Sequence, residues 1–106
     1  MVLSFTNGNV TTDGTEQSLW NITADKHFAG WIFLNNMGVN EVISVRIYVQ
    51  DENDSASLKK YIDTSISGSQ GTPAFFIPYV PSKQHKVTVQ LTSGSNIVLY
   101  WQRAEA

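Results

Sequence analysis

The residues of this chain that could carry out chemistry are few, and their spacing does not match a catalytic or metal-binding motif. His27 and His85 are the only histidines, and neither is spaced from another ligand as metal sites require. Cysteine is absent, and so is the Gly-X-Ser-X-Gly pattern of a nucleophilic serine. A Ser-His-Asp triad would have to use one of the two histidines. The residue types therefore predict a protein that is not an enzyme.

Two polar segments have compositions close to those of ligand-binding loops. Residues 51–55 form an acidic run, but the helical calcium loop needs Glu at its twelfth position, where this chain has Ile62. Gly68-Ser69-Gln70-Gly71 is not followed by the Lys-Ser/Thr of a phosphate loop. The acidic residues stand mainly in expected turns, which disfavours a carboxylate pair for glycoside hydrolysis. We therefore expect no cofactor and no metal.

Tryptophan and tyrosine could provide one kind of binding chemistry. Aromatic rings can stack on a sugar, so these residues could form the platform of a carbohydrate-binding β-sandwich. They could instead fill a small core and its rims, and we expect that role for most of them. The set consists of Trp20, Trp31, Trp101, Tyr48, Tyr61, Tyr79 and Tyr100.

The elements that must position these residues are strands, because apolar and polar residues alternate with a period of two. In residues 42–50, Ile43, Val45, Ile47 and Val49 share one face, and residues 86–92 repeat the pattern. Residues 28–34 are apolar on both faces, which predicts a central strand buried between two layers, and Gly30 within them suggests a bulge or a close approach. Further strands are expected at residues 2–6, 17–23, 57–66 and 97–103.

Polar turns separate these segments. Asn7-Gly8 and Asp13-Gly14 are dipeptides that favour tight turns, and residues 51–55 and 92–96 are expected to be hairpin connections. Short strands at this spacing are typical of a sandwich or barrel. We predict an all-β fold, an antiparallel β-sandwich of jelly-roll type with seven or eight strands, in which residues 1–106 form one domain.

The surface expected from this composition is polar but weakly charged. Charged residues make up 15% of the chain, against about 25% in an ordinary soluble domain, whereas 34 of the 106 residues are Ser, Thr, Asn or Gln. With a net charge of −2 and no basic stripe, we expect no nucleic acid and no membrane as partner. Residues 1–10 lack the pattern of a signal peptide, so we expect synthesis in a cytoplasm without export.

A proline-rich segment at residues 71–82 differs from the rest of the chain. Proline cannot donate to a β-ladder, so this segment is expected to be an edge strand or an extended loop. It could cover the core, or it could contact a neighbouring subunit. For a subunit contact, the candidate interface residues are Phe75, Phe76, Ile77 and Tyr79, and the turns at Asp51–Ser55 and Ser67–Gly71 are second choices.

Several segments together resemble a group of small β-sandwich proteins that tailed phages and archaeal viruses encode. The segments are Asp13-Gly14-Thr15-Glu16-Gln17 leading into Leu19, residues 28–37 ending in Asn36-Met37, residues 45–49, residues 73–78, and residues 86–94. The resemblance implies a virion structural role as a capsid decoration, turret or minor coat subunit, and the group has no catalytic residues to carry over. Asn40-Glu41 departs from it, because a Gly-Asp turn is expected there.

Together these observations predict a non-enzymatic viral structural protein located in the virion. Its expected partners are further copies of itself, in a homo-oligomer of closed symmetry, and other capsid proteins. The alternative is a carbohydrate- or receptor-binding module, for which the partner would be a host-surface glycan.

Overall fold

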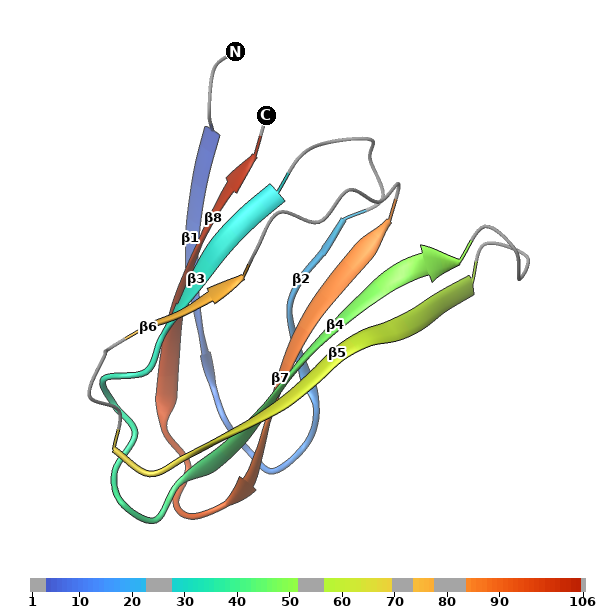
Figure 1. Ribbon diagram of the computed structural model, residues 1–106. Coiled ribbons are helices and arrows are strands. Elements are labelled where there is room, and N and C mark those ends of the chain that lie inside the picture. Colours follow the sequence, from blue (N-terminus) through green and yellow to red (C-terminus); the bar gives the residue numbers. More distant parts are fainter. Residues whose placement is uncertain (1–3, 23–27, 52–56, 70–73, 78–83, 106) are drawn as a thin grey trace.

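The computed structural model describes residues 4–22, 28–51, 57–69, 74–77 and 84–105, which form two four-stranded antiparallel sheets that face each other (Figure 1). Sheet I contains, in spatial order, β1 (Ser4–Thr11), β8 (Val98–Glu105), β3 (Phe28–Phe33) and β6 (Ala74–Ile77). Sheet II contains β2 (Gln17–Ile22), β7 (His85–Ser93), β4 (Val42–Asp51) and β5 (Ser57–Ser67). The predictions of an all-β fold and of an antiparallel sandwich are confirmed.

Strands at mirror-image positions in the chain pair with each other. β1 pairs with β8, β2 with β7, β3 with β6 and β4 with β5, always antiparallel. Two further pairings, β3 with β8 and β4 with β7, join these hairpin-like pairs into the two sheets. The same pattern results if the chain is laid out as one long hairpin with its tip between β4 and β5 and is then rolled up. The start of β1 and the end of β8 consequently lie next to each other, with Ser4 paired to Glu105 (Figure 1).

The core fills the space between the sheets with residues from the inner faces of the strands. Ile43, Val45 and Ile47 of β4 are fully buried, and Val49 packs against them from the end of the strand, as the alternation predicts. The rest of the cluster includes Leu19, Trp20, Ile32, Leu34, Met37, Ile77, Val87, Val89, Leu91 and Leu99. Burial of such side chains is the main favourable contribution to the folding of a β-sandwich.

Two tryptophans enlarge this core, and two glycines make room for them. The rings of Trp20 and Trp101 pack against each other with their centroids 5.3 Å apart. A side chain at Gly8 would collide with the indole of Trp101. A Cβ atom at Gly30 would lie 2.8 Å from the ring of Trp20 and 2.7 Å from the carbonyl oxygen of Gln102. The prediction of a close approach at Gly30 is therefore confirmed.

The structure corrects the prediction for the first strand. Asn7-Gly8 is not a turn, because both residues lie within β1 and pair with Gln102 and Trp101 of β8. Gly8 is in the strand because of the space that Trp101 needs, and not because of a turn conformation. Positive φ angles, which tight turns often need, occur instead at Gly14, Gly68 and Gly94, with values of 87°, 73° and 96°.

One other expectation about the strands was wrong, and one strand departs from simple alternation. Residues 92–96 are not a hairpin connection, because β7 lies in sheet II and β8 in sheet I. Leu19 and Trp20 are both buried although they are neighbours, because a register shift between Ser18 and Trp20 breaks the alternation in β2. The hairpin predicted at 51–55 fits the pairing of β4 with β5, which reaches Asp51 and Ser57.

Within the described residues there is no helix of the length and apolar character that crossing a membrane requires.

Candidate binding face

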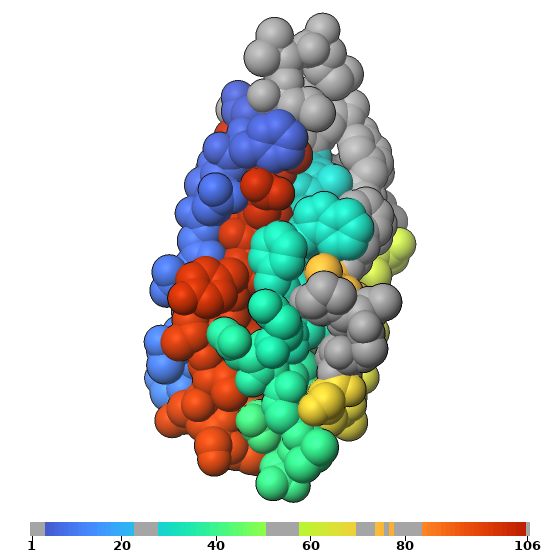
Figure 2. All heavy atoms as spheres, turned by 90° about the vertical axis from the view of Figure 1, so that its left-hand side faces the viewer, coloured from blue at the N-terminus to red at the C-terminus, as the bar shows by residue number. Residues whose placement is uncertain are grey.

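The outer face of sheet I is the part of the described surface that differs most from an ordinary solvated surface. Figure 2 shows β1, β8 and β3 side by side on this face, in blue, red and cyan. Alternation along these strands places on it Phe5, Asn7, Asn9, Thr11, Ala29, Trp31, Phe33, Val98, Tyr100, Gln102 and Ala104. None of these described residues carries a charge. We call this set the uncharged face.

Large aromatic side chains on the uncharged face are exposed to solvent. Phe5 is 61% exposed, Trp31 42% and Tyr100 51%. The prediction that residues 28–34 lie between two layers is thus wrong for one side of β3. Ile32 points into the core and is fully buried, whereas Trp31 points away from it. A two-layer sandwich covers each sheet on its inner side alone, so the second apolar side of β3 remains at the surface.

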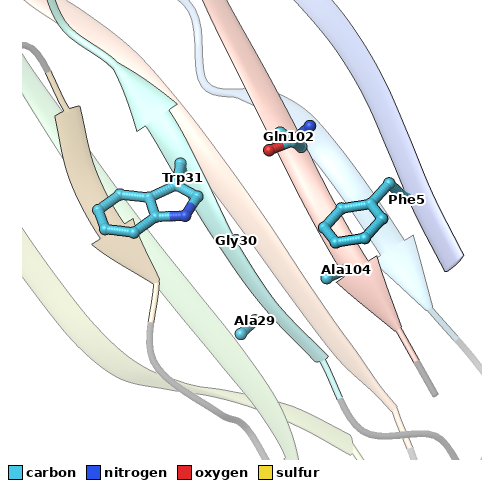
Figure 3. A pocket seen from close by; sticks show the side chains of 6 residues that line it. All are labelled: Phe5, Ala29, Gly30, Trp31, Gln102 and Ala104. Carbon is cyan, nitrogen blue, oxygen red and sulfur yellow. The ribbon is translucent and has the colours of Figure 1, made fainter. Parts of the chain in front are cut away.

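A shallow hollow of about 50 Å³ lies within this face, between Phe5 and Trp31 (Figure 3). The two rings stand on opposite sides of a floor made by Ala29, Gly30 and Ala104, and the side chain of Gln102 lies next to them. We call it the Phe5–Trp31 hollow.

The strand register explains why this floor is low. Ala104 lies directly across from Phe5 on one side and from Ala29 on the other. In the next row, Gln102 lies between Asn7 and Trp31. Cross-strand neighbours have their Cβ atoms about 5 Å apart, so two adjacent alanines leave a gap that the larger residues surround. β8 and β3 hydrogen-bond to strands on both sides, so the floor lies inside the sheet and not at its edge.

The outer face of sheet II has a different surface, which carries charged groups that pair with one another. Glu16 accepts hydrogen bonds from the hydroxyls of Thr88, at 2.6 Å, and Tyr48, at 2.7 Å, and its second oxygen lies 3.4 Å from Nη1 of Arg46. The bonds from Thr88 and Tyr48 lower the pKa of Glu16 below its usual value. The bond to Glu16 in turn raises the pKa of Tyr48.

The pairing continues along β4 and β5. Nε of Arg46 lies 3.4 Å from Asp63, and Asp63 also pairs with Lys60 at 3.2 Å. The hydrogen bond from Lys60 is the main reason why the pKa of Asp63 is lowered. Nη1 of Arg46 donates to Gln90 at 2.9 Å, and the ammonium of Lys86 lies 4.6 Å from the ring centroid of Tyr48. The charged groups named here thus interact with other side chains of the same chain.

Of the two histidines, His85 lies within the described residues. It is fully buried, its Nε2 accepts a hydrogen bond of 2.9 Å from the indole N–H of Trp20, and its ring lies 4.5 Å from that of Phe28. Its Nδ1 is buried without a partner among the described residues. Burial, together with the nearby Arg103 guanidinium, lowers the pKa of His85 to about 4. His85 is therefore a neutral core residue that cannot reach a substrate.

The remaining chemical candidates form no site in the part of the chain that the structure covers. The described residues contain no group of His, Asp and Glu that could hold a metal ion. His27 and Tyr79 lie outside the described residues, as do 52–55 of the acidic run and 70–71 of the glycine segment. Gly68 and Ser69 form a bend after β5, where the N–H of Gly68 donates to the carbonyl of Glu41 at 2.8 Å.

The structure divides the predicted interface residues. Ile77 is 1% exposed and belongs to the core, so it cannot contact another molecule in this fold. Phe75 is partly buried and packs against the core. Phe76 occupies the backbone position of β6 that pairs with Trp31, and its side chain lies outside the description. As predicted, the proline segment contributes an edge strand, β6.

The structure also divides the predicted aromatic platform. Trp20 is buried, Trp101 packs against the core, and Trp31 alone of the tryptophans is an exposed residue. Sequence reasoning missed Phe5, Gln102 and the two alanines of the floor. A usable signal for the face as a whole existed in residues 28–34, which are apolar on both sides. The pairing of Phe5 with Ala104, by contrast, depends on a register between the two ends of the chain.

Fold and surface together define a class: an antiparallel β-sandwich in which one outer face is uncharged and rich in exposed aromatic residues. No protein-family model, curated protein or solved structure matches the chain.

Proposed function

We propose that the protein is a non-enzymatic structural subunit of a viral particle, acting as a capsid decoration, turret or minor coat protein, and that its fold is a jelly roll. The observation that carries this proposal is the pairing of β1 with β8, β2 with β7, β3 with β6 and β4 with β5. A jelly roll has eight strands in two sheets and occurs in viral capsid and lectin domains. The eight strands of the described residues are divided between two sheets in this way.

Because one fold can serve many functions, the surface supplies the second support. In a contact across a two-fold axis the same patch of two subunits meets, so a charged group near the axis lies close to its own copy. Like charges brought together at an interface cost several kcal/mol. Phe33 and Ala74, which pair across β3 and β6 at the edge of sheet I, are uncharged and avoid this cost, whereas Arg46, Asp63 and Lys60 of sheet II already pair within the chain.

The proposed contact between subunits lies at the β6 edge of sheet I. β6 pairs with β3 on one side, and prolines at 73 and 78 flank it in the sequence. Prolines at an edge oppose strand addition, so we propose that the contact is made by side chains. With Ile77 in the core, Phe76 is the first residue to test, and Tyr79 stays a prediction from the sequence.

Sedimentation velocity of the purified protein tests this function. We expect a closed oligomer, or binding to purified capsids, and we expect Phe76→Asp to abolish it while the variant keeps its β-sheet circular dichroism. Tyr61→Asp is the matched control, because Tyr61 is an exposed aromatic residue of the edge strand β5 in sheet II. A wild-type protein that stays monomeric and binds no capsid at any concentration would contradict the proposal.

A carbohydrate-binding domain is the second candidate, since the jelly roll also occurs in lectins. The observation that favours it is the Phe5–Trp31 hollow, with its two exposed rings and the amide of Gln102.

A further inference from the structure

We propose that the Phe5–Trp31 hollow binds the ring of a neutral sugar. The site consists of the two aromatic walls Phe5 and Trp31, the low floor of Ala29 and Ala104, and the amide of Gln102 at one side (Figure 3). The position lies on β1, β8 and β3, away from the tip of the rolled hairpin between β4 and β5.

The chemistry of the lining selects this ligand class. Aromatic faces carry partial negative charge and favour contact with the weakly positive C–H groups on one side of a pyranose. A sugar also needs donors and acceptors for its hydroxyls, and the amide of Gln102 supplies both. Asn7, directly across from Gln102 in the register and exposed, offers a second amide beside it. Aromatic rings next to a few polar groups are typical of small-molecule sites.

Charge and shape argue against other ligands. The six residues that line the hollow are uncharged, so an anion or a cation would lose hydration without gaining a counter-charge. An extended peptide usually binds to a free sheet edge, but the floor of the hollow lies on β8 and β3, which are hydrogen-bonded on both sides. A hollow of about 50 Å³ is too small to enclose a drug-sized molecule, whereas one ring can lie on it with a single face in contact.

Such a shallow site binds weakly. A monosaccharide has about a dozen heavy atoms. Multiplied by the binding free energy that a ligand commonly gains per heavy atom, this number corresponds to a dissociation constant on the order of 1 mM. Many copies on one particle would raise the apparent affinity by about a hundredfold or more. This gain rests on the proposed structural role, while the binding to one copy does not.

The test is an NMR titration of the ¹⁵N-labelled full chain at a concentration where sedimentation shows a single species. The probes are methyl glucoside, methyl galactoside, methyl mannoside and methyl N-acetylglucosaminide, and N-acetylneuraminate is the anionic control. We expect at least one neutral probe to shift the Trp31 indole and Gln102 amide signals in a saturable manner. Gln102→Ala and Phe5→Ala should each weaken this binding by about fivefold or more, as expected for the loss of one contact in a small site.

Tyr61→Ala is the matched control, because it removes an aromatic side chain that is 64% exposed on sheet II, and its binding should match that of the wild type. Three outcomes would overturn the proposal: no saturable shift with any neutral probe up to about 100 mM, binding that survives both substitutions, or equal binding of N-acetylneuraminate. A fourth is broadening of the Trp31 signal with protein concentration alone, since a second copy would then cover the hollow. Failure of these probes would leave the sedimentation result for Phe76→Asp unaffected, so the two proposals fail separately.

Discussion

The two sheets of this sandwich face solvent with opposite kinds of surface. On sheet II, Glu16, Arg46, Asp63 and Lys60 form a continuous line of ion pairs across the strands. On sheet I, none of the described residues on the outer side of β1, β8 and β3 is charged. Three large aromatic side chains are exposed there, those of Phe5, Trp31 and Tyr100. Both sheets have four strands and share one core, so the difference does not come from their position in the fold.

The difference teaches which surface contributes to the fold and which is left for other molecules. The charged groups of sheet II pair within the chain and connect Glu16, next to β2, with β7, β4 and β5, which leaves few of them for a ligand. Exposed aromatic residues gain little within the chain, since half of their surface stays in water. Clustered exposed apolar groups commonly mark an interaction site. We therefore propose that the functional contacts lie on sheet I, and that sheet II and the core supply the stabilising contacts.

The largest expected effect comes from the layer beneath the uncharged face. Gly30→Val should lower the free energy of unfolding by about 3 kcal/mol or more, because its Cβ would meet a backbone carbonyl that cannot move aside. The obstacles are the carbonyl of Gln102 at 2.7 Å and the ring of Trp20 at 2.8 Å. Urea denaturation measures the change.

Gly38→Ala is the matched control. Its Cβ would meet the flexible side chain of Glu41, at 3.2 Å, and not a backbone atom. We expect a change within about 0.5 kcal/mol. If Gly30→Val were as stable as this control, Trp20 would not pack against β3 as described, and the floor of the hollow would be misplaced.

The second effect is a pH dependence of stability that comes from His85, which is buried in the core between the two sheets. His85 has its pKa lowered from 6.5 to about 4 in the folded protein, so the unfolded chain binds the proton more tightly. The contribution of neutral His85 to the free energy of unfolding is therefore present above pH 6.5 and is lost as the pH falls towards 4. At pH 5 the loss amounts to about 2 kcal/mol. Thermal unfolding at pH 7 and pH 5 measures it.

His85→Gln removes this titrating group while keeping a side-chain oxygen that can accept from Trp20. Its stability should change much less between pH 7 and pH 5 than that of the wild type. The pKa of Glu16 is lowered in the folded protein as well, but its contribution is lost at more acidic pH, below the ordinary glutamate pKa of 4.5. An equal pH dependence in wild type and His85→Gln would show that another group is responsible.

The third effect tests whether the charged surface contributes to the fold. Glu16→Gln removes the charge that faces Arg46 and weakens the hydrogen bonds from Thr88 and Tyr48. Because charge-assisted hydrogen bonds are stronger than neutral ones, we expect a loss of about 1 kcal/mol in urea denaturation. Glu41→Gln is the control, since the Glu41 carboxylate accepts a long hydrogen bond, of 3.3 Å, from the N–H of Gly38. Equal effects of the two substitutions would mean that the ion pairs of sheet II add nothing to stability.

The side chains that face the core could be predicted from the sequence, whereas the arrangement of those on the outer faces largely could not. Alternation in residues 42–50 and 86–92 predicted which side chains of β4 and β7 face the core, because one side of each strand is purely apolar. Asn7-Gly8 misled the prediction, because Gly8 is determined by Trp101, a residue distant in sequence. The register shift in β2 had no local signal. The hollow depends on the pairing of β1 with β8, which joins the two ends of the chain.

The smallest effect on stability is expected at the uncharged face itself. Phe5→Ser and Tyr100→Thr should each change the free energy of unfolding by no more than about 0.5 kcal/mol, because both side chains are more than half exposed and surface substitutions rarely cost more. Tyr61→Thr on sheet II is the control of similar exposure. A loss above about 1 kcal/mol for Phe5→Ser alone would mean that its ring belongs to the fold. The aromatic residues of sheet I would then be a second small core, and the reason to seek a ligand or a neighbouring subunit on that side of the molecule would disappear.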